Sequence, residues 1–430
     1  MVEVKSDTKV QIDLLISPIG ELATPHLDSG PARGNAMDSI KKVHDGAIAI
    51  KDGLIVYAGR REEVLSKVRL DNATTIDATN KLVTPGLIDP HTHLVFGGNR
   101  HEEFAMRCQG KTYKEIADQG GGIVASMRGT REATVQDLIG LGKQRLERIL
   151  AHGTTSCEVK TGYGLDRQSE LNMLEAILTL DSMQPVELTP TFMPAHAVPP
   201  GTQREAYVTE VIEDMLPAAA ELAKKKAYPT SAIYVDVFCD EGYFTLEDTK
   251  RIFDKAISLG MKLKVHSDEF KSLGATALAC EMGAHSADHL LAITDSDIDR
   301  LASSSCVAVL LPGTSFFLNL KEHAPARTMI DKGVAVAIGS DFNPGSCHIF
   351  SMPFIMGLAC LKLGMTAAEA LTAATMNSAY AIGRGENIGQ LREGYQADIV
   401  LWNVSKLAEI PYNMGWNSVE TVIKKGAKCE

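Results

Sequence analysis

Hydrophobic and polar residues alternate along the middle of the chain in one repeated unit: an amphipathic helix, a glycine and a short apolar strand. In one copy, Thr245 and Asp248 have the spacing of a capping box, and apolar residues then recur at helical intervals. Gly260 follows at the position where helices end with φ > 0, and residues 261–265 form the expected strand. Similar units begin at two other threonines, Thr134 and Thr294.

These units predict a parallel sheet, because strands that alternate with helices pair through right-handed crossovers. Eight apolar runs fit this pattern: residues 82–89, 155–160, 186–194, 233–238, 262–266, 286–289, 307–311 and 334–338. Eight units indicate an α/β fold of the (β/α)8 TIM-like barrel type, with its chemistry at the carboxyl ends of the strands. A doubly wound open sheet is the alternative, but it would bring a glycine-rich phosphate loop after the first strand, which this sequence lacks.

The two ends of the chain follow another pattern, in which short strand-like runs are separated by glycine and charged turns. Such runs occur near the start, as at residues 46–50, and return near the end, as at residues 397–402. We therefore expect residues 1–83 and 386–430 to form one small, discontinuous β-sandwich domain and residues 84–385 to form the barrel.

Composition narrows the possible partners and the compartment. The net charge of −11 disfavours nucleic acid and anionic membranes, so an anionic small molecule would need cations placed locally at its site. We expect neither a signal peptide nor a membrane span, which needs about 20 consecutive apolar residues. The eight cysteines form no C-x-x-C pair, which favours reduced thiols in a cytoplasmic protein.

Histidine and aspartate residues follow several of the predicted strands. His91 and His93 come after the first, and residues i and i+2 of a strand face the same side. A lone H-x-H is weak evidence, but His266, His289 and Asp341 stand at the ends of three more strands. Imidazoles and a carboxylate that converge in this way are ordinary ligands for zinc or iron.

This pattern resembles the amidohydrolase superfamily, whose signature places H-x-H on the first barrel strand, His on the fifth and sixth, and Asp on the eighth. The resemblance spans almost the whole chain, including the split β-domain. It implies one divalent metal ion per subunit, zinc or iron, and a homodimer that acts on a small-molecule substrate. The implied ligands are His91, His93, His266 and Asp341.

Further motifs are similar to one group within the superfamily, and they lie at residues 120–123, 160–165, 195–199, 236–240 and 341–346. The implied reaction is hydrolysis of the cyclic amide of 4-imidazolone-5-propanoate to N-formimino-L-glutamate in histidine degradation. In it a water is acidified by the metal, and Asp341 takes a proton. His289 stabilises the oxyanion, and Glu269 contacts the ring and protonates the leaving nitrogen. The alternative for Glu269 is a carboxylate at a helix N-terminus.

An anionic substrate tail needs donors, and the resemblance implies that Arg100, Tyr113 and Tyr163 hold the propionate. A guanidinium suits this role because its planar fork matches a carboxylate. The alternative for Arg100 is a surface salt bridge with Glu102 or Glu103.

Other binding residues are implied on two further loops. His196 would face the ring of the substrate. Asn343, Gly345 and Ser346 would form a tight loop that presents backbone N–H groups and short polar side chains to the ligand, although a plain turn would have the same sequence.

Lys160 bears on the number of metal ions. In binuclear relatives a lysine on the fourth strand bridges two metals, whereas Lys160 ends the second predicted strand, which favours one metal. We expect Lys160 to be a pocket-edge or structural charge. Two other functions stay open: a mononuclear amidohydrolase acting on a purine or pyrimidine, and a metal-free paralogue that serves as a scaffold.

Overall fold

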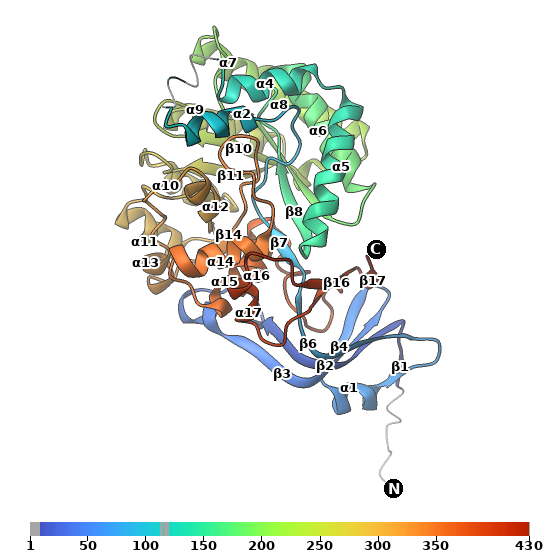
Figure 1. Cartoon of the computed structure of the whole chain (residues 1–430). Helices are drawn as coiled ribbons and strands as arrows, with labels where there is room; N and C mark the ends of the chain where they lie inside the picture. Colours follow the sequence, from blue (N-terminus) through green and yellow to red (C-terminus); the bar gives the residue numbers. More distant parts are fainter. Residues whose placement is uncertain (1–8, 112–114, 116–119, 430) are drawn as a thin grey trace.

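Eight parallel strands form the centre of the larger part of the molecule, in the unbroken order β7 to β14 (Figure 1). The computed structural model describes residues 9–111, 115 and 120–429. The barrel strands are β7 (Leu87–Asp89), β8 (Thr154–Lys160), β9 (Glu187–Ala195), β10 (Tyr234–Cys239), β11 (Lys262–Ser267), β12 (Ser286–His289), β13 (Val307–Leu310) and β14 (Val336–Ile338). All eight coincide with predicted runs, so the expected barrel is confirmed.

The barrel closes through the segments that follow its first and last strands. The Asp341 N–H donates to the His91 carbonyl at 3.0 Å, and the His93 N–H donates to the Phe342 carbonyl at 2.9 Å. Thr92 and Phe342 form a parallel bridge at the same point. The seam of the barrel is therefore built from the residues on which the metal prediction rests.

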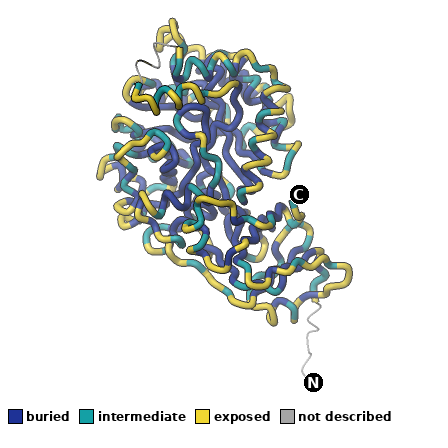
Figure 2. Tube along the Cα trace, in the orientation of Figure 1, coloured by how far each residue is buried: buried dark blue, intermediate teal, exposed yellow. Residues whose placement is uncertain are grey.

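Helices surround the strands, and Figure 2 shows a buried centre under an exposed outer surface. Thr245 forms the predicted capping box with Asp248, and Thr134 forms another with Asp137; both boxes satisfy free N–H groups at the helix starts. The helices between strands are α2 (His101–Cys108), α4 (Ile123–Glu132), α5 (Val135–Ala151), α6 (Arg167–Asp181), α7 (Arg204–Glu210), α8 (Leu216–Lys225), α9 (Leu246–Ser258), α10 (Ala275–Met282), α11 (Asp295–Ser303), α12 (Pro312–Phe317), α13 (Ala326–Asp331), α14 (Met352–Lys362), α15 (Ala367–Ala374) and α16 (Met376–Ala381).

Strands from both chain ends share one seven-stranded sheet below the barrel (Figure 1). Its order is β17 (Ala427–Lys428), β16 (Val419–Lys424), β15 (Ile399–Trp402), β6 (Thr74–Pro85), β2 (Leu14–Pro25), β3 (Ile40–Lys51) and β4 (Leu54–Arg60). The two ends meet where β15 runs antiparallel to β6, with Leu401 opposite Val83. A second, two-stranded sheet pairs β1 (Val10–Gln11) with β5 (Val68–Arg69). The predicted extra β-domain is confirmed, and its boundaries at 83 and 386 stay predictions.

The inside of the barrel holds charged side chains. Glu158, Lys160, Asp236, Lys264 and Asp288 are all fully buried. Lys160 Nζ lies 2.7 Å from a carboxylate oxygen of both Glu158 and Asp236, and 3.6 Å from Asp288. Buried charges are costly unless they are paired, and here two lysines face three carboxylates. Lys160 is thus a structural charge within the barrel, which is the second of the two roles expected for it.

Two predictions from composition can be compared with the structure. All eight cysteines are free thiols, as expected. Among the described residues, no helix combines the length and the hydrophobicity that crossing a bilayer would require.

Candidate metal centre and substrate cavity

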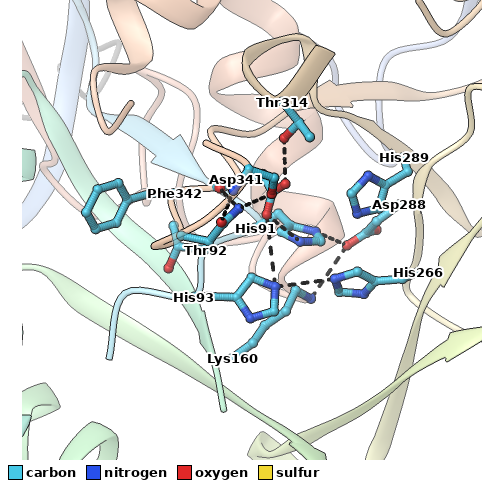
Figure 3. A network of polar contacts seen from close by, with 12 residues as sticks. His91, Thr92, His93, Lys160, His266, Asp288, His289, Thr314, Asp341 and Phe342 are labelled. Atoms are coloured by element: carbon cyan, nitrogen blue, oxygen red, sulfur yellow. Dashed lines mark hydrogen bonds and ion pairs between the residues drawn. The ribbon is translucent and has the colours of Figure 1, made fainter. Parts of the chain in front are cut away.

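Four histidines and one aspartate from four strand ends converge at the mouth of the barrel (Figure 3). The His93 and His266 Nε2 atoms are 3.4 Å apart, and Asp341 Oδ1 lies 3.5 Å from His91 Nε2 and 4.0 Å from His93 Nε2. The ring of His289 lies 5.0 Å from that of His266, centroid to centroid. The predicted convergence of His91, His93, His266 and Asp341 is therefore present.

The outer nitrogen of each of three histidines is held by an acceptor. His91 Nδ1 lies 2.6 Å from Asp288 Oδ2, His266 Nδ1 lies 3.0 Å from both Asp236 oxygens, and His93 Nδ1 lies 3.3 Å from the Thr161 carbonyl. Such partners favour a proton on Nδ1, which leaves the Nε2 lone pair of each ring directed into the cluster.

The cluster fits a divalent cation. His91 Nε2 and both ring nitrogens of His289 are buried without a hydrogen-bond partner in the part of the chain that the structure describes. Burial, followed by nearby positive charges, lowers the pKa of His91, His93 and His289, so these imidazoles are neutral, as metal ligands must be. Neutral imidazoles with free Nε2 atoms around one carboxylate suit zinc or iron.

Several other groupings of ligand atoms are possible in the same space. His91, His93 and Asp341 lie within ligand distance of one another, but so do three more sets: His91, His266 and His289; His93, His196 and His266; and His91, Glu158 and Asp288. Only the first set includes the carboxylate at the end of the last strand. The geometry alone does not choose one ligand set over the others.

Asp341 is held in an unusual backbone conformation. Its φ is 51°, and Asp268 (54°) and His289 (81°) at neighbouring strand ends also have positive φ. Such conformations cost about 1–3 kcal/mol each in non-glycine residues and are common at functional sites. Asp341 Oδ2 accepts a hydrogen bond from the Thr314 hydroxyl at 2.5 Å, which leaves Oδ1 directed toward the histidines.

Glu269 lies beside His289, with its Oε2 3.5 Å from His289 Nδ1. Burial first, and then the negative charges of Asp341 and Asp240, raise the pKa of Glu269 well above its usual value. A raised pKa favours the protonated carboxyl group over a wider pH range, which suits a proton donor. The alternative of a helix N-terminal carboxylate does not describe Glu269, because the helix that follows, α10, begins only at Ala275.

A cavity of about 800 Å³ opens above the cluster. It is lined by most of the predicted binding residues, namely Arg100, Tyr163, His196, Glu269, His289, Asp341, Asn343, Gly345 and Ser346. The predicted ligands His93 and His266 also line it, whereas His91 lies beneath. Tyr113, predicted to hold the substrate tail, lies outside the described residues.

Two aromatic rings form one wall of the cavity against the histidines. His196 stacks on His93 with ring centroids 4.7 Å apart, and its Nδ1 lies 2.9 Å from the Gly162 carbonyl. Burial lowers the pKa of His196 to about 3, so its ring is neutral. Tyr163 packs edge-on against His93 at 5.5 Å.

The loop that holds Asn343, Gly345 and Ser346 is arranged differently from the prediction. The Gly345 and Ser346 N–H groups both donate to Asn343 Oδ1 at 2.8 Å, and Asn343 Nδ2 donates to the Asp341 carbonyl and to Ser346 Oγ. The expectation that these backbone N–H groups face a ligand was wrong, because the Asn343 side chain uses them. A binding role for the three residues stays a prediction.

Arg100 lies in the cavity wall and forms the salt bridge that was its alternative interpretation. Its Nε and Nη2 donate to Glu103 Oε2 at 2.9 and 2.7 Å, and both side chains are largely buried. A methyl group on Gly345 would overlap the Arg100 guanidinium, so a larger residue at this position would have to displace the Arg100 side chain. The two interpretations of Arg100 are therefore compatible.

The sequence analysis missed a second arginine in the cavity. Arg107 lines it, and so do Glu103 and Phe104, all on α2. Positions 100, 103, 104 and 107 have the spacing of one helical face, which was a signal in the sequence. The expected strands and the helix units gave no helix between His93 and Thr134, so this face was not predicted.

Comparisons with known proteins agree with this geometry. The family model described as "Amidohydrolase family" matches residues 82–429. The imidazolonepropionase of Symbiobacterium thermophilum is 47% identical over 418 residues and that of Bacillus thuringiensis (strain Al Hakam) 43% over 415, each covering 96% of both chains.

Solved structures share the fold at low sequence identity. A zinc-bound adenosine deaminase from Xanthomonas campestris has a TM-score of 0.72 at 18% identity, covering 98% of this chain and 93% of its own. The E. coli guanine deaminase has a TM-score of 0.68 at 16% identity, covering 97% and 98%. Sequence match, fold and converging strand-end residues agree, and this chain belongs to the amidohydrolase family.

Proposed function

We propose that this protein is an imidazolonepropionase, which hydrolyses the cyclic amide of 4-imidazolone-5-propanoate to N-formimino-L-glutamate. The observation that carries the proposal is 43–47% identity to imidazolonepropionases over 96% of the chain. The cavity supports it, since two arginines stand beside a neutral histidine cluster and can receive a small ring with an anionic tail.

One divalent ion, zinc or iron, is proposed at His91, His93, His266 and Asp341. When bound, it would supply Lewis-acid chemistry, polarising the ring carbonyl and acidifying a water. The buried lysine–carboxylate network supports a single site, because Lys160 is engaged by Glu158 and Asp236 and is not placed to bridge two ions.

The residues around the cluster have complementary parts in the proposed hydrolysis. The Asp341 carboxylate lines the cavity beside the histidine cluster, so it would receive the proton of the attacking water while the Thr314 hydroxyl holds its orientation. His289 has unpartnered ring nitrogens within the described part of the site and would donate to the developing oxyanion. Glu269, whose pKa is raised by burial, would protonate the leaving ring nitrogen, and its carboxylate would then recover the proton from Asp341.

Incubation of the purified protein with 4-imidazolone-5-propanoate tests the proposal. We expect N-formimino-L-glutamate to form. Its formation should stop after treatment with a chelator and resume when zinc or iron is added. Failure of the metal-loaded protein to open the ring would contradict it.

A deaminase acting on a purine or pyrimidine is the second candidate, and its motivation is the shared fold of the two deaminase structures. Such an enzyme does not need a carboxylate clamp. An Arg100→Ala variant separates the two functions: full turnover of 4-imidazolone-5-propanoate by this variant would contradict the substrate assignment.

We also propose that the enzyme is a homodimer in the cytoplasm. Measurement of its molecular mass in solution tests the dimer.

A further inference from the structure

Arg100, which caps the start of α2, and Arg107, within α2, meet at one residue of the cavity wall. Arg100 packs its guanidinium against Gly345, and Arg107 Nη2 donates to the Gly345 carbonyl at 3.2 Å. Both line the cavity, and both contacts fall on the loop that follows the last barrel strand. The two cationic groups are therefore neighbours, although seven positions separate them in the sequence.

The two arginines differ in how their charge is balanced. Two donors of Arg100 are bound to one oxygen of Glu103, whose other oxygen accepts from the Gly122 N–H at 3.0 Å. Glu103 is thus fixed in place, and an incoming carboxylate that approaches Arg100 also meets this negative charge. Arg100 alone is a poor anion site.

Arg107 forms no such ion pair within residues 9–111 and 120–429, where its side-chain hydrogen bond goes to the Gly345 carbonyl. Glu103 acts on it only electrostatically, from a position already bound to Arg100. The rings of Phe104 and Phe317 lie 5.8 and 5.2 Å from its guanidinium and hold it by cation–π contact. Such contacts orient the group while leaving its remaining N–H donors available to a ligand.

We propose that Arg107 is a specificity-determining residue, which supplies a second positive charge beside the Arg100–Glu103 pair and so selects substrates with a carboxylate tail. The inference rests on the proposed function and deepens it. Glu103 holds the Arg100 guanidinium in position, and the positive charge of Arg107 balances the negative charge of Glu103. A carboxylate held between two guanidinium groups accepts several charge-assisted hydrogen bonds, whereas a neutral tail gains none of them. Rings without an anionic tail would leave this end of the cavity unused.

The test compares wild type with Arg107→Met, which keeps an unbranched apolar side chain but removes the charge and the donors. We expect KM for 4-imidazolone-5-propanoate to rise by about 10- to 100-fold, the usual effect of losing a charged hydrogen-bonding partner. The kcat should stay within about threefold of wild type, since the contact is made equally before and during the chemical step. The matched control is Arg167→Met, because Arg167 is exposed, pairs with Asp214 and does not line the cavity.

A structural role would give another result. If Arg107 only supports the loop through the Gly345 carbonyl, its loss would weaken every ligand. Calorimetry with two inhibitors separates the roles: imidazole-4-propanoate should bind Arg107→Met about 10- to 100-fold more weakly, and tailless 4-methylimidazole should bind it unchanged. Equal weakening of both inhibitors, or an unchanged KM, would overturn the inference while leaving the proposed function intact. A wild-type enzyme that does not turn over the substrate would instead contradict the proposed function, and this inference with it.

Discussion

Replacing Asp236 with Asn should weaken metal binding without rebuilding the cluster. Both carboxylate oxygens of Asp236 lie 3.0 Å from His266 Nδ1. Asp236 also accepts hydrogen bonds from the backbone N–H of His266 at 3.0 Å and from Lys160 Nζ at 2.7 Å. Asparagine keeps one oxygen that accepts from His266 Nδ1–H but loses the negative charge. The Nε2 atom of His266 then becomes a weaker metal ligand, because the group that accepts the hydrogen bond from Nδ1 is neutral.

The magnitude follows from these contacts. A hydrogen bond to a charged group contributes about 1.5–3 kcal/mol and a neutral one about 0.5–1.5 kcal/mol, so the loss is about 1–1.5 kcal/mol. That is about a tenfold increase in the metal Kd. Lys160 loses one partner but keeps Glu158 at 2.7 Å and Asp288 at 3.6 Å. The loss of folding stability should therefore fall below the about 3–5 kcal/mol expected when a buried charge loses its only partner.

Competition with a chelator of known affinity measures the metal Kd, and thermal unfolding measures stability. The control is Asp248→Asn, which changes another buried aspartate, in the capping box of α9, away from the cluster. We expect the control to unfold at a lower temperature and to bind metal normally. A metal Kd for Asp236→Asn within about twofold of wild type would refute the assigned role of the carboxylate behind His266.

Two further predictions concern proton delivery and the cavity wall. Glu269→Gln should lower kcat by about 10²- to 10⁴-fold with little change in KM, as steady-state kinetics would show. Because burial and then the charge of Asp341 raise the pKa of Glu269, its acid form persists to higher pH than that of an exposed glutamate. The wild-type kcat should fall as pH rises through that raised pKa, and a flat alkaline limb would contradict the donor role. Gly345→Ala should displace the Arg100 guanidinium and raise KM about tenfold or more, whereas Gly140→Ala, with nothing within 4 Å of the added methyl group, should not.

The fold was largely predictable from local patterns. Each helix–glycine–strand unit satisfies its own N–H groups and stops at its own glycine, as Thr245, Asp248 and Gly260 show, so the barrel strands could be located one by one. The ligand candidates followed, because a barrel brings all strand ends to one face.

The parts that could not be predicted depend on contacts between distant segments. Glu158 and Lys160 alternate on one strand face, which indicates charges inside the barrel, but their partners Asp236 and Asp288 lie on other strands. The hydrogen bonds that Asn343 Oδ1 accepts within its own loop could not be predicted either. A turn whose N–H groups face a ligand and a turn whose N–H groups are bound by its own side chain have the same composition.

The central claim is that three histidines and one aspartate hold a single ion. A crystal structure of the zinc-loaded protein, with an anomalous difference map at the zinc edge, tests it most directly. We predict one peak, about 2.0–2.2 Å from His91, His93 and His266 Nε2 and from Asp341 Oδ1. Two peaks, or one peak bound by His93, His196 and His266 without Asp341, would contradict the account.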